Sequence, residues 1–294
     1  MVLDLPELPG VRHDHLDLPT GVRVHVAETG PPDAPPVLCL HGWPQHFLIW
    51  RHVWPELSPR YRVICPDLRG HGWSGWPDDG DFRKARFADD TIALMDALGI
   101  PRAHVIGHDW GAWTAMLLGL GHPERVQSLL ALSIVHPWQP TATALKNLWR
   151  FAYQLPLSTP WLGERLVRRE GFVRWVMRTG WGDDSTWDED AARSYEATMR
   201  GPAGARASHL VYQSFVVSEI SAPLRGRFPG TRFEMPARLM IGERDGLGPN
   251  LAAGFERHGA DAAWETVPGA GHFLPEERPA LVAERALALL AAAG

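Results

Sequence analysis

The 294-residue sequence has only two cysteines, almost no lysine and no long run of basic residues. Cys39 and Cys65 lie in apolar, strand-like stretches, VLCLHG and RVICPD, where we expect small buried thiols and not a disulfide. The formal net charge is −5. Because this negative charge and the lack of a long run of Lys or Arg argue against a surface that follows a phosphate backbone, we expect no nucleic-acid partner.

Membrane, metal and dinucleotide signals are also missing. No apolar stretch is long enough to span a bilayer, and MVLDLPELPG lacks the regions of a signal peptide, so we expect a cytoplasmic protein that does not bind membranes. The H-E-x-x-H motif is absent, and His13 and His15 have no third ligand nearby, so we expect no metal and no cofactor. Gly70, Gly72 and Gly75 match G-x-G-x-x-G, but WPDDGD follows instead of a helix, which indicates a loop.

Apolar runs typical of buried strands alternate with helical patterns through the first half of the chain. We expect strands at residues 22–28, 36–42, 62–68, 103–109 and 128–135, and helices at 87–100 and 112–121. Continuous apolar strands separated by helices indicate a mostly parallel sheet that is covered on both faces.

The pattern changes after this half. Residues 137–235 are rich in Trp, Arg and Pro and have helical spacing without a clear buried strand. A strand pattern resumes at PARLMIGERD, and a long Ala/Leu helix follows near the end of the sequence. This order predicts a core of residues 1–136 and 236–294, with residues 137–235 inserted as a helical cap.

The stretch GHDWG, residues 107–111, follows a buried strand and opens a helix. A Gly-x-nucleophile-x-Gly turn in that setting presents the attacking side chain of a hydrolase, usually Ser. Here the central residue is Asp109. A carboxylate is ionised at neutral pH without a base, so it can displace at a saturated carbon. The product is an ester of the enzyme, which water must then cleave with help from a histidine.

Candidates for that histidine and its orienting acid follow later in the chain. His272 lies in a Gly-flanked loop, VPGAGHFLPEE, after the last expected strand, and Asp245 ends the strand pattern LMIGERD. The chain order nucleophile, acid, histidine is that of the α/β-hydrolases. Glu243 is a competing acid, but Asp245 lies further past the strand, where its loop can reach a facing histidine.

A second loop supplies candidate donors for a tetrahedral oxyanion. LCLHGWP, residues 38–44, places a His-Gly turn at the end of another central strand. Backbone amides of this loop and of the residue after the nucleophile normally hold the oxyanion, which points to the amides of Trp43 and Trp110. We expect His41 to orient its loop and not to take part in the chemistry.

The motifs HGWP, DLRGHGWS, GHDWG, GERD and GAGHF together resemble the epoxide hydrolase and haloalkane or haloacetate dehalogenase branch of the α/β-hydrolase superfamily. The resemblance covers most of the core. It implies an α/β-hydrolase fold with a mostly parallel eight-stranded sheet flanked by helices, and a helical cap. HGWP, DLRGHG and GHDWGAW are most similar to the epoxide hydrolases, in which Asp opens the epoxide and His with a second Asp hydrolyses the ester.

The resemblance also implies where a leaving group is held. Epoxide hydrolases of this branch use two cap tyrosines, and Tyr212 in SHLVYQSF matches the second of them. At the first position, alignment on QLP places Trp149, with Tyr153 four residues further on. An indole N–H donates a hydrogen bond but releases no proton near neutrality, so Tyr153, one helical turn along, is an alternative to Trp149.

Dehalogenases of the branch use the same nucleophile and give the main alternative. Trp110 matches the indole against which haloalkane dehalogenases hold the halide, although their oxyanion-loop Asn is Trp43 here. The carboxylate-binding arginines of haloacetate dehalogenases correspond to Trp110 and Trp113, and an indole cannot pair with a carboxylate in bidentate fashion. Their acid after the sixth strand corresponds to Ser133, which again favours Asp245.

The sequence therefore predicts an epoxide hydrolase that takes a small apolar organic substrate and water. Fourteen tryptophans are consistent with an aromatic-lined pocket, although core packing explains most of those in the cap. Two alternatives stay open, a dehalogenase and a non-catalytic ligand-binding receptor on a hydrolase scaffold. We expect a monomer or a homodimer.

Overall fold

The computed structural model describes residues 4–139, 146–219, 228 and 230–294. Its centre is an eight-stranded sheet with the order β1-β2-β4-β3-β5-β6-β7-β8. The β1–β2 and β2–β4 pairs are antiparallel and the remaining pairs are parallel, as the sequence predicts. The strands are Arg12–Leu18, Val22–Thr29, Pro36–Leu40, Arg62–Pro66, Ala103–His108, Val126–Leu132, Ala237–Gly242 and Ala262–Val267, β1 to β8 in turn.

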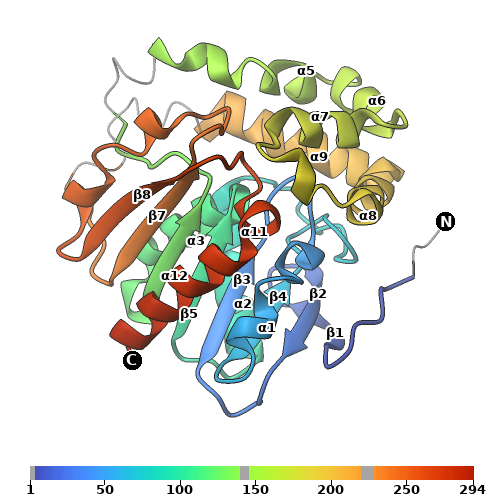
Figure 1. The fold of residues 1–294 in the computed structure, drawn as a ribbon. Helices are drawn as coiled ribbons and strands as arrows, with labels where there is room; N and C mark the ends of the chain where they lie inside the picture. Colours follow the sequence, from blue (N-terminus) through green and yellow to red (C-terminus); the bar gives the residue numbers. More distant parts are fainter. Residues whose placement is uncertain (1–3, 140–145, 220–227, 229) are drawn as a thin grey trace.

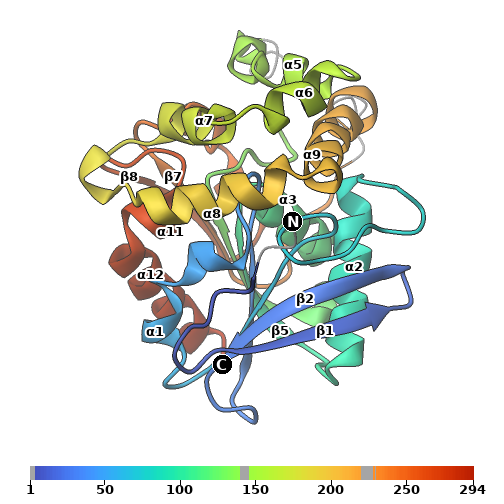
Figure 2. The ribbon, with the colours of Figure 1, turned by 90° about the vertical axis from the view of Figure 1, so that its right-hand side faces the viewer.

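Helices cover both faces of the sheet (Figures 1 and 2). On one face lie α1 (Trp54–Leu57) and α12 (Pro279–Ala292), and on the other lie α2 (Lys84–Ala97) and α3 (Trp110–Gly121). Every residue of β5, the strand that leads to GHDWG, is buried. Such burial on both faces explains why the parallel strands are continuous apolar runs.

Short helical turns connect the core elements. They include η1 (Phe47–Trp50), η2 (Pro123–Arg125), η6 (Pro249–Leu251), η7 (Phe255–His258) and α11 (Leu274–Glu277). Cys39 and Cys65 are buried free thiols, as expected from their strand positions. No helix in the described part of the chain is long and apolar enough to cross a membrane.

A layer of helices lies over the carboxyl ends of the parallel strands (Figure 1). Between residues 146 and 219 the structure has helices and connecting turns but no strand. The boundaries of the predicted cap, 137 and 235, stay a prediction, and residues 140–145, 220–227 and 229 of it lie outside the described residues. Its elements are η3 (Leu148–Phe151), α5 (Gln154–Ser158), α6 (Leu162–Arg168), α7 (Phe172–Gly180), η4 (Asp184–Thr186), α8 (Glu189–Arg200), α9 (Pro202–Ser214) and the π-helix η5 (Phe215–Glu219).

Candidate active site

Asp109 stands at the sharp turn between β5 and α3, with a backbone φ of 51° and ψ of −120°. A non-glycine residue at positive φ is strained, and the surrounding glycines make the turn sterically possible. A Cβ on Gly107 would collide with the Gly111 carbonyl, and one on Gly111 would collide with the Leu40 carbonyl. The paired glycines of GHDWG are therefore required by the close approach of three backbone segments.

Two backbone amides hold the Asp109 carboxylate. The Trp43 N–H donates to Oδ2 at 3.0 Å, and the Trp110 N–H also interacts with the carboxylate. A Cβ on Gly42 would lie 2.6 Å from Oδ2, so the HGWP loop approaches Asp109 closely only because position 42 is glycine. The two amides therefore converge on the Asp109 carboxylate, and their role as an oxyanion hole stays a prediction.

The HGWP loop is itself fixed by a buried histidine. His41 Nε2 accepts the Leu68 N–H at 2.9 Å, and Nδ1 lies 3.0 Å from the Gly42 carbonyl. Burial lowers the pKa of His41, so the ring is neutral at physiological pH. These contacts are consistent with the prediction that His41 orients the HGWP loop.

His272 lies between Asp109 and Asp245. Its Nε2 is 3.9 Å from Asp109 Oδ1, and its Nδ1 is 3.1 Å from Asp245 Oδ2. The other Asp245 oxygen accepts the Leu247 N–H at 2.9 Å. Glu243, the competing acid, is exposed and accepts the Gly269 N–H, so Asp245 is the acid that contacts the histidine.

Burial and charge shift the pKa values of these groups in different directions. Burial raises the pKa of Asp109 to about 6, although His272 and the two amides oppose the rise. Burial alone would lower the pKa of His272, but Asp245 and then Asp109 raise it to about 9. The pKa of Asp245 is lowered despite burial, mainly by the His272 charge. At neutral pH the resting site therefore holds an Asp109 carboxylate beside a protonated His272.

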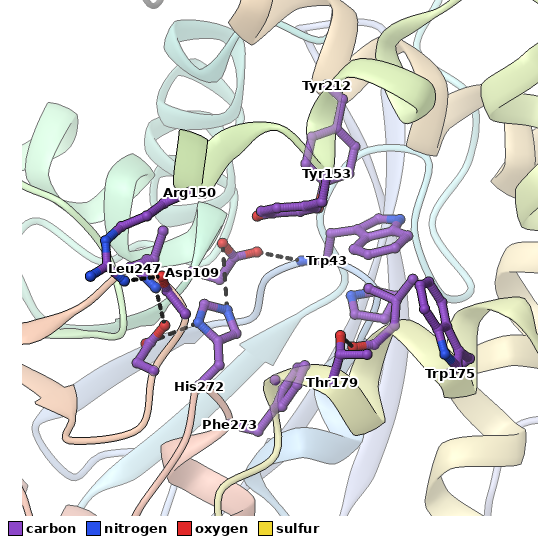
Figure 3. A pocket seen from close by; sticks show the side chains of 15 residues that line it. Trp43, Asp109, Arg150, Tyr153, Trp175, Thr179, Tyr212, Leu247, His272 and Phe273 are labelled. Carbon is purple, nitrogen blue, oxygen red and sulfur yellow. Dashed lines mark hydrogen bonds and ion pairs between the residues drawn. The ribbon is translucent and has the colours of Figure 1, made fainter. Parts of the chain in front are cut away.

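A cavity of about 200 Å³ opens above Asp109 (Figure 3). It is mostly apolar, and both core and cap contribute to its wall. The lining residues are Trp43, Pro44, Asp109, Arg150, Tyr153, Trp175, Val176, Thr179, Gly180, Tyr212, Asp245, Gly246, Leu247, His272 and Phe273.

Tyr153 and Tyr212 meet above Asp109. Their ring centroids are 6.1 Å apart, their hydroxyl groups interact, and the Tyr153 hydroxyl points towards Asp109 (Figure 3). Although Tyr153 is 45% exposed as a whole, burial of its hydroxyl raises its pKa, and burial raises the pKa of Tyr212 as well. Both phenols therefore keep their protons and are available as hydrogen-bond donors.

The other two predicted leaving-group residues lie elsewhere. Trp149 is 68% exposed and is not part of the cavity wall. The Trp110 ring is buried behind the wall, where it packs against Phe215 and lies 4.4 Å from the Lys84 ammonium. Of the two cap alternatives from the sequence, the cavity therefore contains Tyr153 and not Trp149.

Several wall residues have no sequence signal of their own. Arg150 comes from η3, Trp175 and Thr179 come from α7, and Phe273 follows the catalytic histidine candidate. Their presence depends on how α7 and η3 pack over the core, which residue periodicity alone does not determine. Among the described residues, no three His, Cys, Asp or Glu side chains are grouped in a way that could hold a metal ion.

Comparisons with known proteins connect this geometry to a family. The sequence pattern of the alpha/beta hydrolase fold family matches residues 35–279. The chain is 32% identical to a fluoroacetate dehalogenase from Burkholderia sp over 195 residues, 61% of this chain and 62% of that protein. It is 42% identical to epoxide hydrolase A of Mycobacterium tuberculosis over 119 residues, 39% of this chain and 36% of the relative.

A solved structure extends the likeness to the whole chain. A Pseudomonas aeruginosa protein provisionally named an epoxide hydrolase superposes with a TM-score of 0.84 at 31% identity, over 99% of this chain and 98% of that chain. The chain belongs to the α/β-hydrolase fold family. It is a hydrolase, and its relatives place it in the branch that contains epoxide hydrolases and dehalogenases, which confirms the family predicted from the motifs. The matches to the two named enzymes span less than two thirds of either relative.

Proposed function

We propose that the protein is an epoxide hydrolase that converts an apolar epoxide to a diol through an ester of Asp109. The observation that carries the proposal is the grouping of four functions in one cavity. A carboxylate nucleophile lies below two tyrosine hydroxyls, two amides flank it, and the His272–Asp245 pair stands beside it. The tyrosines are the feature that favours an epoxide over a carbon–halogen bond.

In the first step, Asp109 Oδ1 attacks a ring carbon of the epoxide while the ring C–O bond breaks. Oδ2 stays on the Trp43 N–H and becomes the carbonyl oxygen of the new ester. The departing ring oxygen takes a proton from the hydroxyl of Tyr153 or Tyr212, since an alkoxide is more basic than a phenolate. Tyr153, and not Trp149, is the partner of Tyr212 in holding the ring oxygen, because Tyr153 lines the cavity and Trp149 does not.

After the first step the protonated His272 supplies the proton that restores the tyrosine hydroxyl, which leaves a neutral imidazole. In the second step this imidazole removes a proton from water, and the resulting hydroxide attacks the ester carbonyl carbon. The Trp43 and Trp110 amides hold the oxyanion until it collapses to the Asp109 carboxylate and the free diol. The Asp109 charge is one of the causes of the raised pKa of His272. Ester formation removes that charge and so lowers the pKa of His272. His272 therefore loses its proton more readily after the first step, and only the neutral ring can act as a base.

A dehalogenase with the same nucleophile is the second candidate, and likeness to the fluoroacetate dehalogenase favours it. Two features weigh against it. The Trp110 indole, which resembles the halide-binding group of haloalkane dehalogenases, does not line the cavity. Trp113 is buried in α3 where haloacetate dehalogenases have a carboxylate-binding arginine.

The test is the intact mass of a His272→Gln variant incubated with epoxides and with haloalkanes or haloacids. Without the base the ester persists, so an adduct with the full mass of the epoxide is expected. An adduct equal to the haloalkane or haloacid minus its halogen, with no epoxide adduct, would support the dehalogenase instead. Absence of any adduct, together with micromolar binding of the intact compound, would support the receptor alternative.

A further inference from the structure

Glu277, the last residue of α11, is 2% exposed and accepts four backbone hydrogen bonds. Two of them come from the turn that carries His272, since Gly271 N–H donates to Oε2 at 2.9 Å and Phe273 N–H donates to Oε1 at 3.1 Å. The other two come from the cap segment after α7. Gly182 N–H and Asp183 N–H both donate to Oε2, at 2.8 and 3.1 Å.

The same cap segment touches the histidine turn directly. The His272 N–H donates to the Gly180 carbonyl at 2.8 Å, so the base is bonded to the cap through its own backbone. A Cβ on Gly182 would collide with the Gly271 nitrogen, and one on Gly271 would collide with the Gly180 carbonyl. Segment 180–183 and the His272 turn are therefore packed backbone against backbone.

A carboxylate suits this junction better than its amide. Both Glu277 oxygens face N–H donors, and an ionised carboxyl offers acceptors only. In glutamine one of the two positions becomes an NH₂ group, which is itself a donor. Whichever way the amide is turned, at least one of the four N–H groups loses its acceptor inside the protein, at a cost of about 1–3 kcal/mol.

We propose that Glu277 is a positioning residue, which holds His272 against Asp109 and joins the end of α7 to the catalytic turn. This role rests on the proposed function, because it assumes that His272 acts on an ester of Asp109. It also implies that segment 180–183 stays with the core when substrate enters. The negative charge of Glu277 adds to its effect, since it contributes to the raised pKa of His272.

The test compares Glu277→Gln with Glu276→Gln. Glu276 is the adjacent buried acid, and it accepts hydrogen bonds from Arg51, Gln45 and Tyr195 but from neither Gly271 nor Phe273. Glu277→Gln is expected to lower kcat by at least about tenfold with kcat/KM within about threefold, so that KM falls together with kcat, and to let the covalent ester accumulate, because the displaced base acts in the second step. Glu276→Gln is the matched control for lost stability and is expected to accumulate no ester.

A substrate-free measurement separates this proposal from the proposed function. The pKa of His272 is followed by NMR, with its signal assigned from the His272→Gln spectrum, and is expected to fall in Glu277→Gln but not in Glu276→Gln. Equal His272 pKa values and equal kcat in the two variants would overturn the proposal. If the wild type converts no epoxide, the proposed function fails, and the NMR comparison still decides whether Glu277 controls His272.

A second variant covers the case in which Glu277→Gln does not fold. Gly182→Ala leaves the charge in place but forces the cap segment away from Gly271. It is expected to lower kcat and to accumulate ester while the pKa of His272 changes little. A Gly182→Ala protein that folds and turns over at the wild-type rate would show that the contact between cap and histidine turn has no part in positioning the base.

Discussion

Asp109 is held at a cost to the stability of the fold, and the cost is measurable. Its pKa rises from 3.8 to about 6 through burial. A carboxyl with a raised folded pKa costs stability at pH values above that pKa, and costs nothing below the unfolded pKa. A rise of about 2 units corresponds to about 3 kcal/mol at pH 8 and about half of that at pH 5. Asp109→Asn is therefore expected to stabilise the protein while abolishing activity.

The assay is thermal unfolding of the wild type and Asp109→Asn at pH 8 and pH 5. The variant is expected to melt roughly 6 °C higher at pH 8, with a clearly smaller gain at pH 5. The asparagine oxygen still accepts the Trp43 N–H, and any loss of the Trp110 N–H contact costs the same at both pH values, so the difference between the gains at pH 8 and pH 5 is the direct test. A change in stability that is equal at both pH values would show that the site does not raise the pKa of the carboxylate in this way.

Three further predictions concern the cavity and its loops. Gly42→Ala is expected to lower kcat at least about 100-fold in a folded protein, because its Cβ displaces Asp109; circular dichroism and steady-state kinetics test this, and a near-normal rate contradicts it. Tyr153→Phe is expected to slow epoxide opening at least about tenfold. Trp149→Phe is expected to leave the single-turnover rate within about twofold, because Trp149 is outside the cavity. A larger effect of Trp149→Phe than of Tyr153→Phe would mean that Trp149 is the residue that assists ring opening. Asp245→Asn is expected to slow ester hydrolysis about 100-fold or more while adduct formation continues, and rapid-quench kinetics that show both steps unchanged would remove Asp245 from the site.

The core and its candidate site could be predicted from the sequence because their signals are local. The turn around Asp109 needs glycine on both sides for steric reasons, so the five residues of GHDWG predict both the backbone turn and the candidate nucleophile. Strand ends at Asp245 and in the HGWP loop follow from apolar runs. A parallel sheet then brings its carboxyl ends to one edge, so residues far apart in the chain meet at His272.

The cap residues that line the cavity could not be predicted from such local signals. Trp149 and Tyr153 are four residues apart, and which of them faces the cavity depends on how η3 and α5 pack on the core. Glu277 follows another acid just before the helix α12, a pattern typical of exposed residues near a helix N-terminus. Its burial against the cap emerges only in three dimensions. The cytoplasmic location and the choice between monomer and homodimer stay predictions.

The central claim is that the Asp109 side chain becomes covalently bonded to substrate carbon and is released by water. One turnover in ¹⁸O-labelled water, with enzyme in excess over a reactive epoxide, tests it by mass spectrometry of the peptide that contains Asp109. The account predicts one heavy oxygen in that peptide and none in the first diol formed, since the diol takes its second oxygen from the carboxylate. Label in the diol and none in the Asp109 peptide would mean that water attacks the substrate directly, which contradicts the account.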